Sequence, residues 1–342
     1  MKALLFFQHG DLEQVRFKEI SIPKLEPGQV LVKTQVAALN HLDLFVLRGL
    51  PGLRLEMPHI PGSDAAGVVE DVGEKVNLFS KGDRVMLNPV ISCGKCEFCL
   101  SEKDNMCVKL RLIGEHTKGT FAEYFVVPES NLKEIPKDIS FEDAASFSLV
   151  FMTAWHMLKT RAQIKTGDDV FVHGIGGGVS TAALKIIKHC GCRVFVSSSS
   201  REKLIRAKEM GADYCFRYDE VEIVTEVMRI TGKRGVDVVV DSVGAATWRQ
   251  SLQLIKKGGR IVTCGATTGF NSETDIRLIF WKQIDILGST MGNRHEYLKL
   301  LKLLGDRALV PTVDRVYPLS EGKRALQYLQ NQQQFGKVLL RP

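Results

Sequence analysis

Four of the eight cysteines stand close together in one polar stretch of the chain. They are Cys93, Cys96, Cys99 and Cys107, in a segment rich in glycine and charge. Four thiolates at this spacing can close a tetrahedral site around one Zn²⁺ and leave no open position for a substrate. The segment has too few apolar residues to order itself, so we expect metal and loop to order together; structural zinc contributes about 10–16 kcal/mol in small zinc peptides. The spacing therefore predicts one structural zinc.

A glycine-rich turn marks a second chemical site. The turn spans residues 174–179 and contains Gly174, Gly176, Gly177, Gly178 and Val179. The apolar run 170–172 precedes it, an amphipathic segment follows to residue 190, and a second apolar run occupies 194–196. Strand, turn, helix and strand form a βαβ unit in which the glycines let the backbone approach a pyrophosphate at the helix N-terminus. A glycine turn without a ligand is the alternative, but the complete unit favours a bound dinucleotide.

The residues after the second apolar run indicate which dinucleotide binds. An NAD site usually places Asp or Glu there to accept from the ribose 2′-hydroxyl. This chain instead has the hydroxyls of Ser198 and Ser199, followed by the cations Arg201 and Lys203. Hydroxyls and cations suit a 2′-phosphate. A serine-rich loop before an ordinary charged helix is the alternative; we expect NADP(H) rather than NAD(H).

Composition limits the class of protein. With 342 residues, 44% of them hydrophobic, the chain can hold about two domains. The net charge of +7 is spread along the chain without a basic run, which argues against a nucleic-acid partner. No apolar run reaches membrane-spanning length, and the apolar part of the N-terminus is too short for a signal peptide. We expect a soluble cytoplasmic protein that acts on a small molecule without a membrane partner.

The elements that must position these sites follow from periodicity. Short apolar runs alternating with turns predict a small β-rich domain at residues 1–35. Helix 141–158 leads to the βαβ unit, after which strands and helices alternate. The later strands are expected at 214–218, 236–241, 260–264 and 284–288, and the helices at 204–210, 221–231 and 247–256. This alternation predicts a doubly wound parallel sheet, with Gly244 and Gly265 at strand ends where a cofactor would cross the sheet edge.

Several short motifs resemble those of the medium-chain dehydrogenase/reductase superfamily, the zinc alcohol dehydrogenases and quinone reductases. The motifs cover essentially the whole chain, at 82–85, 119–124, 153–155, 241–244 and 336–339. The resemblance implies an α/β protein with a GroES-like, β-rich catalytic domain (1–149 and 289–342) carrying a structural zinc lobe. It also implies a Rossmann dinucleotide-binding domain with a doubly wound parallel sheet (150–288). Relatives are homodimers or homotetramers, and the apolar region 276–287 is a candidate subunit contact.

The chain departs from the alcohol dehydrogenases where they bind a catalytic zinc. The matching positions hold Asn40, Ser63 and Leu149, none of which is a good zinc ligand. Leu42 replaces the hydroxyl that begins the family's proton relay. The last glycine of the dinucleotide fingerprint is Ser180, a small residue that still packs closely. We therefore expect one structural zinc and no catalytic zinc.

The resemblance also assigns candidate roles near the reacting atoms. Asn40 and Asp43 resemble the Asn-x-x-Asp pair of zinc-independent quinone and enoyl reductases, and Asp64 occupies a carboxylate position common to both branches. Thr153 falls where the nicotinamide lies in relatives. His41 falls where a basic residue faces the pyrophosphate, and Lys337 is expected to orient the cofactor.

Each of these roles has an alternative. Asn40 and Asp43 can simply hold backbone turns together, as such residues often do. His41 can be an ordinary surface histidine. His59 and His116 lie beside loops that could reach the cleft, and with Asp43 or Asp64 they could form an unfamiliar metal site.

These observations predict an NADPH-dependent oxidoreductase that delivers hydride to a quinone or an α,β-unsaturated carbonyl. Such acceptors carry their own electron sink and need a Lewis acid less. The alternatives are a zinc-type alcohol or aldehyde dehydrogenase and a protein that binds NADPH without turnover.

Overall fold

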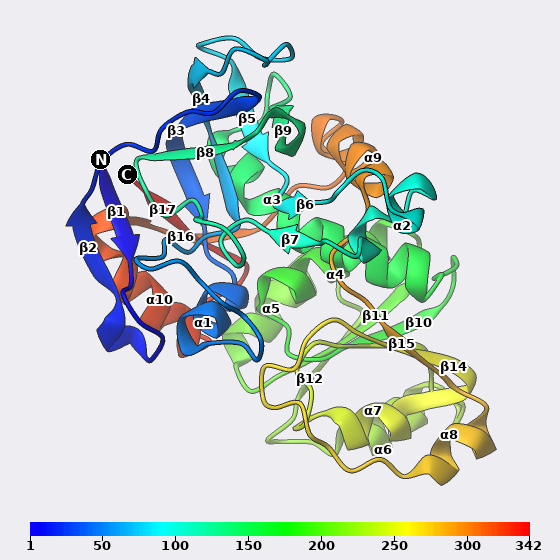
Figure 1. Ribbon diagram of the computed structural model, residues 1–342. Helices are drawn as coiled ribbons and strands as arrows, with labels where there is room; N and C mark the ends of the chain where they lie inside the picture. Colours follow the sequence, from blue (N-terminus) through cyan, green and yellow to red (C-terminus); the bar gives the residue numbers. More distant parts are fainter. The chain divides into compact units, whose positions relative to one another are not determined.

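The computed structural model describes all of residues 1–342, and its contacts divide the chain into two compact units (Figure 1). The first unit combines Met1–Val150 with Asn293–Pro342, and the second is Phe151–Gly292. No helix is both long and apolar enough to cross a bilayer.

The first unit is built on a seven-stranded sheet with the order β16-β17-β3-β4-β5-β9, in which β8 also pairs with β3. These strands are β3 (Gln29–Ala38), β4 (Asp64–Val72), β5 (Arg84–Leu87), β8 (Tyr124–Pro128), β9 (Leu132–Glu134), β16 (Val313–Pro318) and β17 (Lys337–Arg341). Two short antiparallel pairs accompany the sheet: β1 (Lys2–Leu5) with β2 (Arg16–Glu19), and β6 (Val90–Ile91) with β7 (Arg111–Leu112).

The long strand β3 explains how the first unit brings distant segments together. Its first half alternates buried and less buried residues, whereas Val36, Ala37 and Ala38 are all buried. Ala38 pairs with Asp64 of β4, and Ala37 and Ala38 pair with Leu340 and Leu339 of β17. The C-terminal end of β3 therefore lies beside the starts of both β4 and β17.

Among the helices of the first unit, α10 (Gly322–Gln330) packs against β16 and β17 of the sheet. The others are α1 (His41–Arg48), α2 (Glu97–Leu100) and α9 (Arg294–Gly305), with 3₁₀ turns at Leu12–Gln14, Asp104–Met106, Glu129–Asn131 and Leu319–Glu321. The boundary between the two units falls within α3 (Phe141–Trp155).

The second unit is a six-stranded parallel sheet with the order β12-β11-β10-β13-β14-β15. The strands are β10 (Asp169–Val172), β11 (Arg193–Ser198), β12 (Tyr214–Arg217), β13 (Val236–Asp241), β14 (Ile255–Thr263) and β15 (Asp285–Gly288). Its helices are α4 (Gly178–His189), α5 (Arg201–Glu209), α6 (Ile223–Ile230), α7 (Trp248–Leu254) and α8 (Ile276–Lys282). Helices α4 and α5 lie on one side of the sheet and α6 and α7 on the other (Figure 1). The predicted α/β fold class, with a doubly wound parallel sheet, is confirmed.

The strand order reverses between β10 and β13. From β10 the chain winds outward through β11 to β12, and from β13 it winds outward through β14 to β15. Ligands of open α/β sheets bind outside the carboxyl ends of the strands at such a switch point. The glycine turn after β10 is therefore where a dinucleotide is expected.

Most element boundaries differ from the sequence prediction by one to three residues, and the largest difference is at the start of β14. The helix expected at 141–158 ends at Trp155 and continues as a π-helical turn, His156–Arg161. The helix expected at 247–256 ends at Leu254, because β14 begins at Ile255, five residues before the predicted start. Ile255 is fully buried, and the Lys256 ammonium pairs with Asp237 of β13. Gly258 and Gly259 interrupt the apolar pattern that would predict a strand here. Burial of Ile255 and the ion pair of Lys256 nevertheless extend β14 back to Ile255.

Candidate functional site

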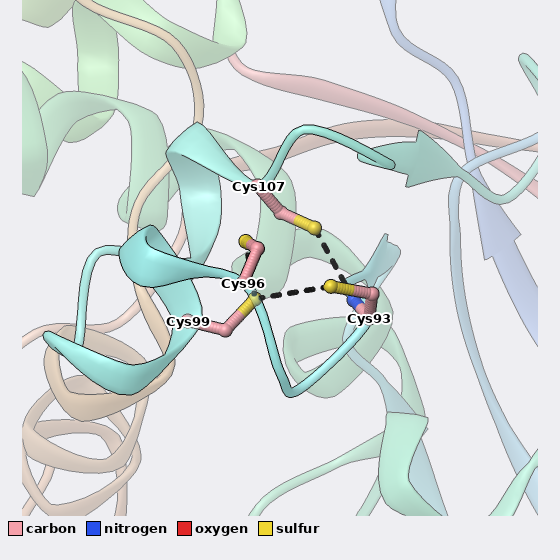
Figure 2. Close-up of side chains that lie close together, drawn as sticks. All are labelled: Cys93, Cys96, Cys99 and Cys107. Carbon is pink, nitrogen blue, oxygen red and sulfur yellow. Dashed lines mark hydrogen bonds between the residues drawn. The ribbon is translucent and has the colours of Figure 1, made fainter.

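The four cysteines predicted to bind zinc converge in the structure (Figure 2). Cys96 and Cys99 are held by α2, Cys93 lies just before it, and Cys107 follows the 3₁₀ turn Asp104–Met106. Their Sγ atoms all lie within 4.8 Å of one another, with 3.5 Å between Cys96 and Cys99 and 3.9 Å between Cys93 and Cys99. A tetrahedral Zn²⁺ with Zn–S bonds of about 2.3 Å places sulfurs about 3.8 Å apart, so the cluster fits one zinc.

Backbone groups around the cluster favour thiolates. The N–H groups of Cys93 and Lys109 point at the Cys107 sulfur, at 3.2 and 3.3 Å. Backbone hydrogen bonds lower the pKa of the Cys96 thiol to about 6, whereas burial raises the pKa of Cys99 to about 11. The Cys99 thiol would therefore lose its proton when zinc binds. With four sulfur ligands it has no position left for a substrate.

A buried polar cluster forms at the C-terminal end of β3. Asn40 follows β3, Asp43 lies in the first turn of α1, Asp64 opens β4 and Lys337 opens β17. The strand pairings described above bring these four residues together, and all four are buried. We call them the Asn40/Asp64 cluster.

Hydrogen bonds link the members of this cluster directly. The Lys337 Nζ donates to Asn40 Oδ1 at 2.6 Å and to Asp64 Oδ2 at 3.1 Å. Asn40 Nδ2 donates to the same Asp64 oxygen at 2.9 Å. The backbone N–H of Leu149 donates to Asp64 Oδ1 at 3.0 Å. Both oxygens of a fully buried carboxylate are thereby satisfied, one of them by an ammonium.

Asp43 occupies a different environment within the cluster. Its two oxygens accept from the backbone N–H groups of Asn40, at 2.7 Å, and Gly62, at 3.1 Å. Burial raises the pKa of this carboxyl to about 7, although those hydrogen bonds and the Lys337 charge lower it. The charge of Asp43 therefore changes near neutral pH.

The three positions that match the catalytic zinc ligands of the alcohol dehydrogenases surround Asp64. Asn40 contacts the carboxylate through its side chain, Leu149 through its backbone, and Ser63 immediately precedes it. The Ser63 hydroxyl is fully buried and has no hydrogen-bond partner. These positions offer an amide, a hydroxyl and a hydrocarbon, not the sulfur and imidazole ligands that zinc favours. The residues present do not fit a catalytic zinc.

The residues predicted to hold the dinucleotide gather at the switch point of the second unit. Gly174 has φ +62° and is exposed, Gly176 has φ +131°, and Gly177 is the N-cap of α4, so that Val179 lies in its first turn. A Cβ on Gly174 would lie 3.2 Å from the Val243 side chain, which places this turn beside the turn that holds Gly244. Open backbone N–H groups at the start of α4 fit a pyrophosphate.

The turn after β13 requires glycine for its own reason. Gly244 has φ +91°, and a Cβ there would lie 2.7 Å from the carbonyl oxygen of Gly269. Its N–H and that of Val243 donate to the buried Asp241 carboxylate, at 2.9 and 3.0 Å. Gly265 is less restricted, since a Cβ there would meet only the Ser242 carbonyl at 3.7 Å.

At the end of β11 the predicted hydroxyls and cations differ in exposure. Ser198 is buried and its Oγ accepts from the N–H of Ser200, at 3.1 Å. Ser199 and Arg201 are exposed, and Lys203 is half-buried on the first turn of α5. No carboxylate lies at residues 197–201. Ser199 and Arg201 are thus the side chains best placed to meet a ligand from solvent.

The remaining candidates are spread over both units. His41 is the half-buried first residue of α1, in the first unit. Thr153 belongs to the second unit, where its hydroxyl lies 3.8 Å from the Met291 sulfur. His59 and His116 bind backbone groups of Gly114 and Leu112, at 3.0 and 3.1 Å. The four cysteines are the one group of three or more His, Cys, Asp or Glu ligand atoms that converges, so the structure does not assemble the unfamiliar metal site.

Sequence reasoning missed two buried polar arrangements. The sequence predicts that Lys337 orients a cofactor, but it does not predict that Lys337 is the ion-pair partner of Asp64. A lysine opening the apolar strand Lys337–Arg341 was the available signal, because a buried ammonium needs a partner. The second arrangement runs from His173 through the Ser251 hydroxyl, at 3.0 Å, to Asp241, at 2.7 Å. It connects His173, which precedes the Gly174 turn, to the Asp241 carboxylate that binds the N–H groups of Val243 and Gly244.

Comparisons with known proteins agree with this architecture. Residues 26–137 match the alcohol dehydrogenase GroES-like domain, and residues 178–306 match the zinc-binding dehydrogenase family. A zinc-type alcohol dehydrogenase-like protein of Schizosaccharomyces pombe is 34% identical over 99% of both chains. A solved structure of an NAD-dependent alcohol dehydrogenase is 40% identical with a TM-score of 0.96, covering 100% of both chains. The human quinone oxidoreductase is 26% identical over 94% of this chain and 91% of its own length.

The similarity therefore extends along the whole chain in both sequence and fold. The chain belongs to the medium-chain superfamily of zinc-containing alcohol dehydrogenases and quinone oxidoreductases, and it is an oxidoreductase of that superfamily.

Proposed function

We propose that this oxidoreductase transfers hydride between a nicotinamide dinucleotide and a small organic substrate without a catalytic zinc. The observation that carries the proposal is the chemistry of Asn40, Ser63 and Leu149, which surround Asp64 and supply no sulfur or imidazole ligand. The zinc that the four cysteines would hold is saturated by its own ligands and serves the fold.

The substrate class follows from the missing Lewis acid. An unactivated alcohol needs its pKa lowered and its developing alkoxide stabilised, a contribution worth several kcal/mol of barrier. A quinone or an α,β-unsaturated carbonyl accepts hydride into a conjugated system that already delocalises the charge. We therefore propose such an acceptor as the substrate, with the hydride supplied by the reduced nicotinamide when it is bound.

The proposed roles of the protein residues are positioning and proton supply. Asn40 is held rigidly by Lys337 and Asp64, so its place at the end of β3 is fixed before a substrate arrives. Asp43 holds a proton for part of the time at neutral pH. Thr153 is proposed to lie against the nicotinamide, as in relatives, and His41 to face the pyrophosphate.

We further propose that the cofactor is NADP(H). The exposed Ser199 and Arg201 at the end of β11, together with Lys203, suit a 2′-phosphate, and residues 197–201 hold no carboxylate that would bind a 2′-hydroxyl. The 40% identical solved structure is named as an NAD-dependent enzyme, so that protein uses NAD rather than NADP. The comparison of NADPH and NADH as hydride donors decides between the two.

A zinc-type alcohol or aldehyde dehydrogenase is the second candidate. The names of the 34% identical protein and of the 40% identical solved structure favour it, and on these similarities alone it is the stronger candidate. For this candidate, some group other than a zinc bound by Cys and His side chains must polarise the alcohol oxygen.

The test is a substrate screen on the purified protein. Quinones, enals and enones are offered with NADPH and NADH, and primary and secondary alcohols with NADP⁺ and NAD⁺. We expect reduction of a quinone or enone with NADPH as the most efficient reaction. Efficient alcohol oxidation with little enone reduction would establish the second candidate instead, and binding without any turnover would refute both.

A further inference from the structure

A buried carboxylate, that of Asp241, lies at the carboxyl end of β13, next to the turns of the dinucleotide site. We propose that Asp241 is a positioning residue that, through Ser251 and His173, sets the shape of the turns after β10 and β13 before the dinucleotide binds. The inference rests on the proposed function and deepens it, because it names the residues that prepare its cofactor site.

Asp241 ties the turn after β13 to the start of α7. Its side chain is 0% exposed. Oδ1 accepts from the N–H groups of Val243, at 3.0 Å, and Gly244, at 2.9 Å, and Oδ2 accepts from the Ser251 hydroxyl at 2.7 Å. The Thr247 hydroxyl lies 2.9 Å from both oxygens. Four donors converge on one carboxylate, so the turn cannot move without breaking hydrogen bonds to a buried group.

Ser251 and His173 extend this network to the glycine turn after β10. The Ser251 hydroxyl has one proton, and its shorter acceptor contact is Asp241 Oδ2, at 2.7 Å, rather than the Thr247 carbonyl, at 3.2 Å. It therefore accepts from Nε2 of His173, which lies 3.0 Å away. Burial lowers the pKa of His173 to about 4, so the ring is neutral and carries its proton on Nε2. Because His173 directly precedes Gly174, the carboxylate on β13 holds the first turn as well as the second.

The two turns lie against each other, so a displacement of one affects the other. Gly174 has φ +62°, and a Cβ there would lie 3.2 Å from the Val243 side chain. The Val243 carbonyl in turn accepts from the N–H and the hydroxyl of Thr268, at 2.9 and 2.8 Å. A Cβ on Gly244 would lie 2.7 Å from the carbonyl oxygen of Gly269. The space beside Gly174 therefore depends on the hydrogen bonds that Asp241 makes to Val243 and Gly244.

Asp237, at the amino end of the same strand, is a buried carboxylate in a different environment. It is 4% exposed and pairs with two cations, the Arg234 guanidinium, at 3.3 Å, and the Lys256 ammonium. All four donors to Asp241 are neutral groups. A buried carboxylate without a cation in contact is the costlier arrangement. Since ligands of such sheets bind at the carboxyl ends of the strands, this cost falls at the edge where a preformed turn contributes to binding.

The test measures cofactor affinity and stability separately, in protein that keeps its zinc. Ser251→Ala removes the link between Asp241 and His173 and leaves the backbone donors to Asp241 in place. It should weaken the binding of NADPH and of NADH alike by about fivefold to tenfold, because one buried hydrogen-bonded link between the turns is lost. Fluorescence titration well below the Tm of each variant measures the two dissociation constants, and thermal unfolding measures stability.

Two further variants separate positioning from stability. Asp237→Asn removes a buried charge that pairs with two cations, so it should lower Tm at least as much as Ser251→Ala and leave both dissociation constants within about twofold. His173→Phe breaks the same link from the other side and should weaken binding like Ser251→Ala. The double variant, His173→Phe with Ser251→Ala, should bind no more weakly than Ser251→Ala alone, because both changes remove one shared link.

The outcomes distinguish the inference from the proposed function. A Ser251→Ala protein that is less stable but binds both dinucleotides like the wild type overturns the inference, and so does a double variant whose loss equals the sum of the two single losses. If Ser251→Ala does not fold, His173→Phe decides by the same two measurements. A wild type that binds neither NADPH nor NADH refutes the proposed function itself, whereas unchanged affinity in the variants refutes only this inference.

Discussion

Asp43 links the charge of the Asn40/Asp64 cluster to pH. Burial raises the pKa of its carboxyl from 3.8 to about 7 in the folded protein. A raised carboxyl pKa stabilises the fold fully below the unfolded value, and this contribution is lost as the pH rises through the folded value. The protein should therefore lose stability from this residue between about pH 4 and pH 7.

Asp43→Asn tests this linkage. Relative to the variant, the wild type should lose at most about 4 kcal/mol of unfolding free energy between about pH 4 and pH 8, because only the wild type must ionise a buried carboxyl. Urea unfolding at several pH values measures the difference. The exposed Asp71→Asn is the matched control and should run parallel to the wild type. A difference between wild type and Asp43→Asn that does not change with pH would contradict the raised pKa.

Cys96 tests the zinc site at the same scale. Cys96→Ser should release about one zinc per chain and lower Tm by at least about 4 °C, since the loop has no core of its own. Elemental analysis and thermal unfolding measure both effects. Turnover at low temperature should persist, because this zinc has no free position. Cys215→Ser, which changes a thiol outside the cluster, should keep the zinc. A variant that folds normally but loses turnover in the chemical step would contradict a structural role.

At the scale of elements, the turn from β11 into α5 decides cofactor choice. Arg201→Ala with Lys203→Ala should weaken NADPH binding by about tenfold or more, because two cations near a phosphate are lost, and leave NADH binding nearly unchanged. Fluorescence titration with both cofactors measures this. Lys257→Ala, an exposed cation on β14, is the control. An equal loss for the two cofactors would show that these side chains do not contact the 2′-phosphate.

Elements with a local sequence pattern could be predicted from the sequence, whereas elements fixed by tertiary contacts could not. The βαβ unit from β10 to β11 could be predicted because its apolar runs, glycine turn and amphipathic segment have the lengths and periodicities of strand, turn and helix. The start of β14 was not, because burial of Ile255 and the pairing of Lys256 with Asp237 are tertiary effects. The cysteine cluster could be predicted from spacing alone. The ion pair of Lys337 with Asp64 could not, because these residues lie far apart in the chain and only the fold brings them together.

For the whole molecule, an open sheet edge leads us to expect an oligomer. β15 is the last strand of the parallel sheet, and the neighbouring helix α8 exposes Ile276, Phe280 and Trp281, with Trp281 74% exposed. An unpaired edge beside exposed apolar side chains is typical of a surface that another chain covers. We expect a homodimer or homotetramer that uses this surface.

Trp281→Glu tests the expected assembly. The new charge would be buried at the contact, so the variant should shift toward the monomer in analytical ultracentrifugation. Leu100→Glu, an exposed apolar residue of α2, is the control and should leave the mass unchanged. A monomeric wild type, or a variant as oligomeric as the wild type, would show that this surface is not the contact.

The metal dependence of turnover tests most directly whether hydride transfer proceeds without a catalytic metal. The rate of NADPH-dependent quinone or enone reduction is measured together with zinc content, before and after a mild chelator and after added Zn²⁺. We expect about one zinc per chain and a rate that neither falls on chelation nor rises with Zn²⁺ while that zinc remains. Two zincs per chain, or a rate that disappears with the removal of a second zinc and returns when it is restored, would contradict the account.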